Sequence, residues 1–236
     1  MKYSNEFGQP IGKPVVGWTP RPRPNGEPVA GRHCRIERLD VRRHLDALYA
    51  VIVDDEPSAW TYMSYGPFDS KAGFQSWLEA ACAQSDPYYY AIVDAATSTA
   101  TGFASYLRIE PTVGVIEVGS IYFSRALRRS VSATEAMYLM MRHAIEDMGY
   151  RRYEWKCDAL NAPSRNAAER LGFSFEGIFR QATIYKDRNR DTAWFSIVDY
   201  EWPDIKRAME RWLDPSNFNP DGSQRTSLRE LRALLT

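Results

Sequence analysis

The sequence contains few of the residues that form disulfides or bind metals. Its three cysteines, Cys34, Cys82 and Cys157, are odd in number and widely spaced. They give neither a disulfide framework nor the paired cysteines of a zinc site. The three histidines are also far apart, without the spacing of metal ligands. We therefore expect reduced thiols, no metal and a cytoplasmic location.

Long apolar runs and an excess of one charge are absent as well. No apolar stretch approaches the roughly 20 residues that cross a bilayer, and the start MKYSNEFGQP lacks the apolar core of a signal peptide. Thirty Lys and Arg residues balance thirty Asp and Glu residues, so the net charge is zero. A general nucleic-acid binder would be basic. The sequence therefore predicts neither a membrane nor a nucleic acid as partner.

What is present suits one globular domain with appended segments. Hydrophobic residues make up 44% of the 236 positions and charged residues 25%, which is enough for one well-buried core. Residues 1–30 are rich in Pro and Gly, and they predict an extended N-terminal arm. We expect the folded domain over residues 31–203 and a helical extension over residues 204–236.

Hydrophobic periodicity predicts the order of the elements. A strand, two helices, three strands joined by short turns, a helix, a strand, a short helix, a two-stranded hairpin and a last helix follow one another. Their approximate ranges are 33–39, 41–53, 69–81, 88–94, 101–110, 114–123, 132–149, 151–160, 162–173, 176–185, 192–202 and 203–213. A helix between two strands implies that these two are parallel, so the fold class is α+β with a mixed sheet.

The turn after residue 123 has an unusual composition. Ser132 with Glu135 suggests a capping box at the start of a helix, and Gly149 suggests its end. The unpaired N–H groups and partial positive charge of such a helix start favour a phosphate. In the alternative interpretation the turn binds no phosphate and is a solvated loop whose serine only caps the helix. Three arginines and three small hydroxyl residues crowd into ten positions: Arg125, Arg128, Arg129, Ser130, Ser132 and Thr134.

Three blocks of sequence carry a resemblance to a known family. They are IEVGSIYF followed by RRSVSATEA, then DALNAPSRNAAERLGFSFEGIFR, then RDTAWFSIVDYEW. Together with the element order they resemble the GNAT superfamily of acetyl-CoA-dependent N-acetyltransferases, and more narrowly the branch that includes the ribosomal-protein alanine N-acetyltransferases. The middle block is the most specific, because Asn-x-x-Ser before a short helix ending in Leu-Gly-Phe recurs in that branch. The resemblance covers about residues 30–203.

The resemblance implies a mostly antiparallel central sheet with a splayed parallel pair in its middle and helices on both faces. It also implies acetyl-CoA as co-substrate, with its pyrophosphate cradled by backbone amides of the turn. Val131 stands where the family has glycine, so this position either keeps a negative φ or the turn differs in geometry. The cradle would consist of Arg128, Arg129, Ser130, Val131, Ser132, Ala133 and Thr134.

The pantetheine arm of the cofactor is expected between the two splayed strands. By the resemblance, backbone groups of Ile121, Tyr122 and Phe123 would pair with it as an added strand would. Asn161 would contact the cofactor near its thiol end. An asparagine ahead of a proline is also a common turn residue, so a purely local role for Asn161 remains open.

Acetyl transfer to an amine needs a base for the amine, a site for the oxyanion and a proton for the departing thiolate. Glu117 is the candidate base, since several family members carry a glutamate at the matching place; otherwise it faces solvent or pairs with an arginine. Ser164 matches a serine of the branch near the cofactor sulfur and is the candidate acid, unless it only bonds amides at a helix start. Tyr122 and Tyr185 are weaker acid candidates.

The acceptor pocket is expected where the loop WTYMSYGPF meets the last hairpin. Trp60, Tyr62 and Tyr65 would form its walls, unless they only pack in the core, and Arg180 and Tyr185 would contact the substrate from the hairpin. Basic hairpin residues favour an anionic group on the substrate, or they are simply solvated: Arg180, Lys186, Arg188 and Arg190.

Three functions remain open at this point. The first is an N-acetyltransferase that moves an acetyl group from acetyl-CoA to a primary amine by direct attack in a ternary complex. The second is a non-catalytic acyl-CoA-binding regulatory domain, which Val131 favours. The third, an RNA- or ribosome-binding module, is disfavoured by the zero net charge. The sequence does not decide between a small-molecule and a peptide amine, and it allows a homodimer.

Overall fold

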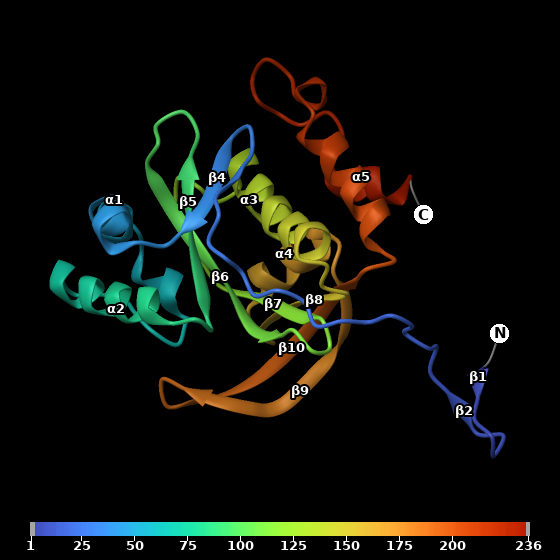
Figure 1. Cartoon of the computed structure of the whole chain (residues 1–236). Helices are drawn as coiled ribbons and strands as arrows, with labels where there is room; N and C mark the ends of the chain where they lie inside the picture. Colours follow the sequence, from blue (N-terminus) through green and yellow to red (C-terminus); the bar gives the residue numbers. More distant parts are fainter. Residues whose placement is uncertain (1–2, 235–236) are drawn as a thin grey trace.

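An eight-stranded mixed sheet forms the centre of the chain (Figure 1). The computed structural model describes residues 3–234. Neighbouring strands of this sheet are antiparallel, except that β7 and β8 are parallel. This arrangement confirms the predicted fold class. In spatial order the strands are β3 (Val29–Ala30), β4 (Cys34–Arg38), β5 (Tyr88–Asp94), β6 (Ala100–Glu110), β7 (Val115–Phe123), β8 (Arg152–Asp158), β10 (Arg188–Val198) and β9 (Ser174–Tyr185).

Helices cover both faces of the sheet, and each face has its own hydrophobic cluster (Figure 1). One face, called here the α1 face, carries α1 (Val41–Val53), the 3₁₀ turn η1 (Pro57–Trp60) and α2 (Lys71–Ala83). The other face, called the α3 face, carries α3 (Val131–Arg142), the π turn η2 (His143–Asp147), α4 (Ala162–Leu171), α5 (Trp202–Leu213), the 3₁₀ turn η3 (Pro215–Asn217) and α6 (Leu228–Ala233). No helix within residues 3–234 has the length and apolar character needed to span a membrane.

Several helix ends follow from local sequence signals. Asp40 caps α1 and Ser70 caps α2, each through a side-chain oxygen that accepts a backbone N–H of the first turn. A capping box of Ser227 and Glu230 opens α6. Gly172 ends α4 in the left-handed conformation, the C-cap conformation that glycine adopts most easily. These signals are local, and for that reason the sequence reveals them.

The capping box predicted for α3 is wrong. Ser130, rather than Ser132, caps this helix, and its Oγ accepts the Ala133 N–H at 3.1 Å. Glu135 does not reach back to the helix start. It is buried and accepts three backbone N–H groups at the beginning of β4, at 2.6–2.8 Å. The carboxylate therefore ties α3 to a distant strand, a role that residue spacing cannot reveal.

The N-terminal segment runs as an extended arm, and its short hairpin of β1 (Tyr3–Ser4) and β2 (Pro10–Ile11) lies away from the sheet (Figure 1). Further along, the arm rests on the domain, where Trp18 Nε1 donates to the Thr112 carbonyl at 2.7 Å. The predicted division of the chain at residues 30 and 203 stays a prediction.

Candidate active site

The parallel strands β7 and β8 separate in the middle of the sheet. They pair from Val115 opposite Arg152 to Val118 opposite Trp155, and no further pair joins them among the described residues. Beyond that point β7 stays with β6, and β8 stays with β10. A gap therefore opens between β7 and β8. Gly119–Phe123 present one backbone edge to this gap, and no described strand pairs with that edge. This is the predicted splay, and Ile121, Tyr122 and Phe123 lie on its edge.

The turn between β7 and α3 does not require a glycine at position 131. Val131 is the first residue of α3 and does not have a positive φ. Arg129 takes the left-handed conformation instead, with a φ of +61°. The position where the family has glycine therefore suits a β-branched residue, and of the two alternatives the first holds.

The start of α3 can hold an anion. Among the described residues, no acceptor takes the backbone N–H groups of Val131 and Ser132, while Ser130 already caps that of Ala133. Free amides and the positive end of the helix dipole together attract phosphate groups. Thr134, by contrast, is buried and accepts a bond from Arg170 Nη1 at 3.1 Å, so its hydroxyl faces α4.

Arg128 reaches away from the helix start. Its guanidinium makes two bonds to Asp55, one of 3.1 Å between Nη1 and Oδ1 and a second from Nη2 to Oδ2. The Tyr122 hydroxyl donates to the same Oδ2 at 2.9 Å. Burial, together with this bond, raises the pKa of Tyr122 above its ordinary value. Neither the guanidinium nor the hydroxyl is free, so nothing here supports Tyr122 as the acid.

Glu117 lies on the α1 face, one residue before the last pair of β7 with β8. Its carboxylate is buried, and Oε2 lies 2.6 Å from Arg108 Nη1 and 3.0 Å from Lys156 Nζ. No described residue donates to Oε1. Burial raises the pKa of Glu117, and the two cations offset part of that rise. Glu117 thus pairs with an arginine, as one alternative held, and still keeps one oxygen without a donor.

Lys156 belongs to the site, although its position in the sequence does not predict this. Its ammonium lies 2.7 Å from Glu154 Oε2 and 3.6 Å from the centre of the Trp194 ring. Glu154 is directly opposite Glu117 in the parallel pair. Two neighbouring buried carboxylates need a cation between them. Lys156 alternates with Trp155 and Cys157 along β8, and this spacing could have placed it on this face, but it does not reveal the carboxylate partners.

The start of α4 brings Asn161 and Ser164 to the other side of the gap. Asn161 Oδ1 accepts the Ser164 N–H at 3.1 Å, so Asn161 has the local capping role that remained open. Its contact with a cofactor stays a prediction. Ser164 Oγ accepts the indole N–H of Trp155 at 3.0 Å. Because Trp155 belongs to the last pair of β7 with β8, the Ser164 hydroxyl lies where the strands part.

The aromatic residues of the predicted acceptor loop have different positions. Trp60 is buried and stacks on Tyr122, with ring centres 4.7 Å apart, and Tyr65 packs against Trp77 at 4.6 Å. These two residues form part of the hydrophobic cluster on the α1 face. Tyr62 is half-buried, and its hydroxyl donates to a carbonyl just before α4 at 3.2 Å. Tyr62 is thus the one of the three whose side chain reaches the segment between β8 and α4.

The loop and the last hairpin meet, as predicted. Lys186 Nζ donates to the Trp60 carbonyl at 2.8 Å, and Arg188 Nη2 donates to the Thr61 carbonyl at 2.7 Å. These two cations bind the loop itself, which weakens the idea that they attract an anionic substrate.

The Tyr185 side chain is held by a hydrogen bond, whereas the Arg180 side chain is exposed. The Tyr185 hydroxyl donates to Asp158 Oδ2 at 2.8 Å. Burial and this bond raise the pKa of Tyr185 to about 12, which makes it a weak acid at neutral pH. Arg180 is exposed at a bulge of β9 against β10.

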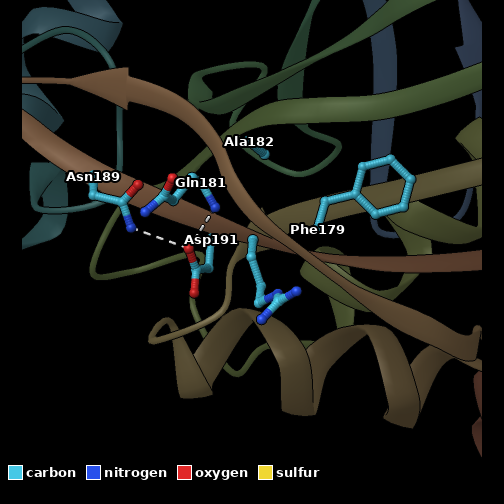
Figure 2. Close-up of a pocket in the computed structure, with 6 residues that line it drawn as sticks. Phe179, Gln181, Ala182, Asn189 and Asp191 are labelled. Carbon is cyan, nitrogen blue, oxygen red and sulfur yellow. Dashed lines mark hydrogen bonds between the residues drawn. The ribbon is translucent and has the colours of Figure 1, made fainter.

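A hollow lies at this bulge, on the hairpin rather than between β7 and β8 (Figure 2). Asp191 Oδ1 accepts the Gln181 N–H at 2.7 Å and Asn189 Nδ2 at 3.0 Å (dashed in Figure 2). A substrate contact of Arg180 stays a prediction. The hollow is lined by Phe179, Arg180, Gln181, Ala182, Asn189 and Asp191.

Comparisons with known proteins point to one family. Residues 35–174 match the family model of the acetyltransferase (GNAT) domain. A GCN5-related N-acetyltransferase from Brucella melitensis is 45% identical, with a TM-score of 0.91 over 93% of this chain and 100% of its own. A GNAT-family protein from Chromobacterium violaceum is 40% identical, with a TM-score of 0.78 over 83% of this chain and 98% of its own.

A more distant structure shares the fold alone. This ribosomal-protein-serine acetyltransferase candidate from Vibrio cholerae is 16% identical, with a TM-score of 0.63 over 73% of this chain and 97% of its own. A search of curated protein sequences finds no match.

Proposed function

Because this chain belongs to the GNAT acetyltransferase family, whose members transfer acetyl groups from acetyl-CoA, we propose that it acetylates a primary amine by direct attack in a ternary complex. One observation carries this proposal. The candidate base and the candidate acid both adjoin the last pair of β7 with β8. Glu117 directly precedes Val118, and the Ser164 hydroxyl bonds Trp155.

The proposed cofactor site follows the gap. The pyrophosphate would accept the free N–H groups of Val131 and Ser132, and the pantetheine arm would pair with the unoccupied edge of Gly119–Phe123. The thioester would then lie near Val118, where the strands part. Glu117 faces this point from the α1 face and Ser164 from the α3 face, because Glu117 alternates with Val118 in β7 and Trp155 packs in the α3-face cluster.

The proposed reaction assigns one proton to each side. The neutral amine attacks the thioester carbon, a C–N bond forms, and the amine proton passes to Glu117 Oε1, the oxygen without a donor. The tetrahedral oxyanion then re-forms the carbonyl as the C–S bond breaks, and the thiolate takes a proton from water or from the Ser164 hydroxyl, which regains a proton from water. A thiol with a pKa near 8.5 leaves without much help, so the acid contributes less than the base.

The acceptor is proposed to approach on the α1 face, past Tyr62 and the last hairpin. The acceptor is a small-molecule or peptide amine. A homodimer and a cytoplasmic location stay predictions. The regulatory alternative, an acyl-CoA binder without turnover, loses its main support, because Val131 has the helical conformation that its position needs.

The test is a screen with acetyl-CoA and a mixed library of amino acids, polyamines, amino sugars and peptides with free N-termini. Thiol release reports turnover, and mass spectrometry identifies the product that gains an acetyl group. We expect amine-dependent thiol release with one class of acceptor. Tight acetyl-CoA binding without thiol release in any pool would favour the regulatory alternative instead.

A further inference from the structure

Asp55 joins parts of the chain that are far apart in sequence. It follows α1, and its side chain is only 1% exposed. Both carboxylate oxygens accept bonds from Arg128, Oδ2 also accepts the Tyr122 hydroxyl, and Oδ1 accepts the backbone N–H of Glu56 at 2.9 Å. Burying a carboxylate is costly unless each oxygen is satisfied, and here each is satisfied by at least two donors.

Arg128 belongs to the turn that leads into α3. Its backbone N–H donates to the Ser124 carbonyl at 2.9 Å, and the next residue, Arg129, has the left-handed conformation. A non-glycine residue keeps such a conformation only where its surroundings hold it. The side chain of Arg128 supplies a hold of this kind, since it fastens the turn to the end of α1.

The same carboxylate also reaches the acceptor loop. Tyr122, which donates to Asp55, stacks on Trp60 with an angle of 11° between the rings. The carbonyl of Trp60 in turn accepts the bond from Lys186 on the last hairpin. Contacts therefore run without a break from the turn before α3, through Asp55, to the loop and hairpin on the α1 face.

We propose that Asp55 is a positioning residue for acetyl transfer. It holds Arg128, and with it the turn, in the conformation that directs the free amides of Val131 and Ser132 toward the cofactor pyrophosphate. Asp55 touches neither substrate. This inference rests on the proposed placement of acetyl-CoA and assigns Arg128 a different role from that of a direct phosphate ligand.

Simple electrostatics predicts the opposite effect from positioning. If Asp55 acted only through its charge, removing a carboxylate near the pyrophosphate would tighten acetyl-CoA binding. If Asp55 positions the turn, Asp55→Asn weakens acetyl-CoA binding, by about tenfold for the loss of a charge-assisted bond. The sign of the change therefore separates the two roles.

The experiment is calorimetric titration of acetyl-CoA into the wild type, Asp55→Asn and Asp54→Asn. Asp54 is the adjacent exposed carboxylate, and it caps α1 only through its backbone, so it controls for charge alone. We expect about tenfold weaker binding for Asp55→Asn and no weakening for Asp54→Asn. Equal or tighter binding by Asp55→Asn would overturn the inference.

Steady-state kinetics adds a readout that a loss of folding would not produce. The KM for acetyl-CoA should rise about tenfold in Asp55→Asn, while kcat at saturating acetyl-CoA changes little. A merely structural defect would lower kcat through a smaller active fraction and leave KM unchanged, and that pattern would contradict positioning.

Arg128→Gln tests the same link from its exposed end, should Asp55→Asn fold poorly. We expect it to weaken binding as Asp55→Asn does, and the double variant to be no weaker than either single one. Additive effects would contradict a shared role. If the wild type itself failed to bind acetyl-CoA, the proposed function would fail, whereas binding and turnover without an effect of either substitution would overturn only the role of Asp55.

Discussion

Lys156 Nζ lies 3.0 Å from Glu117 Oε2, in an ion pair whose side chains are 5% and 3% exposed. The pair crosses from β8 to β7 beside the point where these strands part. A buried carboxylate without a cation would hold its proton, so the ammonium keeps Glu117 available in its basic form. Arg108, which is 58% exposed, covers the same oxygen from the solvent side.

Arg108 should set the pH range of the reaction. The base must be ionised, so kcat/KM falls as the pH drops through the pKa of Glu117. Burial raises that pKa and Arg108 lowers it, so Arg108→Ala should move the acidic limb of the pH profile to higher pH. Arg108→Lys keeps the positive charge, so its acidic limb should stay at the pH of the wild type. An acidic limb that stays in place in Arg108→Ala would show that another group titrates.

Val131→Gly should not improve the cofactor site. Because Val131 already has helical φ, glycine brings no conformation that the turn lacks. We expect an unchanged affinity for acetyl-CoA by calorimetry and a loss of roughly 1–2 kcal/mol in the free energy of unfolding, from the added freedom of the unfolded chain and the lost packing of Val131 against the α3-face cluster. A clear gain in affinity would mean that Val131 obstructs the cradle.

Ser164→Ala should lower kcat while leaving the KM for acetyl-CoA nearly intact. A hydroxyl that donates only in the transition state does not contribute to ground-state binding. The matched variant is Trp155→Phe, which removes the indole donor to Ser164 and leaves the hydroxyl in place. If Ser164→Ala raises KM and keeps kcat, the residue binds or caps instead.

Glu135 should matter for stability rather than for chemistry. Glu135→Ala leaves three backbone N–H groups at the start of β4 without an acceptor, and we expect it to lower the free energy of unfolding by roughly 3 kcal/mol or more. Ser132→Ala serves as control, because Ser132 makes no cap, and should change it by less than about 0.5 kcal/mol. Urea unfolding measures both, and a larger loss in Ser132→Ala would restore the predicted capping box.

Much of the fold could be predicted because its signals are local. In β8, Tyr153, Trp155 and Cys157 alternate with charged residues, and in α3, Met137, Met140 and Met141 recur at helical spacing. These patterns, like the cap at Ser227 and the left-handed Gly172, each depend on residues a few positions apart. The order of strands around α3 then requires a parallel pair, and the splay of that pair was expected from the family resemblance.

The site was harder to predict because its partners meet only in three dimensions. Asp55 lies just after the C-cap of α1, and no residue near it in the sequence indicates a bond to Arg128. Lys156 belongs to the charged side of an alternating strand, which suggests a solvated side chain, yet its ammonium is buried between two carboxylates. Ser132 and Glu135 have the spacing of a capping box, but the long-range demand of the β4 amides prevails.

The kinetics of Glu117→Gln test the central claim most directly. Glutamine keeps the shape of the side chain and removes its basicity, while Lys156 retains Glu154 as partner. We expect acetyl-CoA to bind as before and kcat/KM at neutral pH to fall roughly 10²- to 10⁴-fold, the usual span for one general base. The loss should shrink at high pH, where hydroxide can take the proton of the attacking amine in place of Glu117. Turnover close to that of the wild type at neutral pH, with product release shown not to limit the rate, would contradict the role of Glu117 as base.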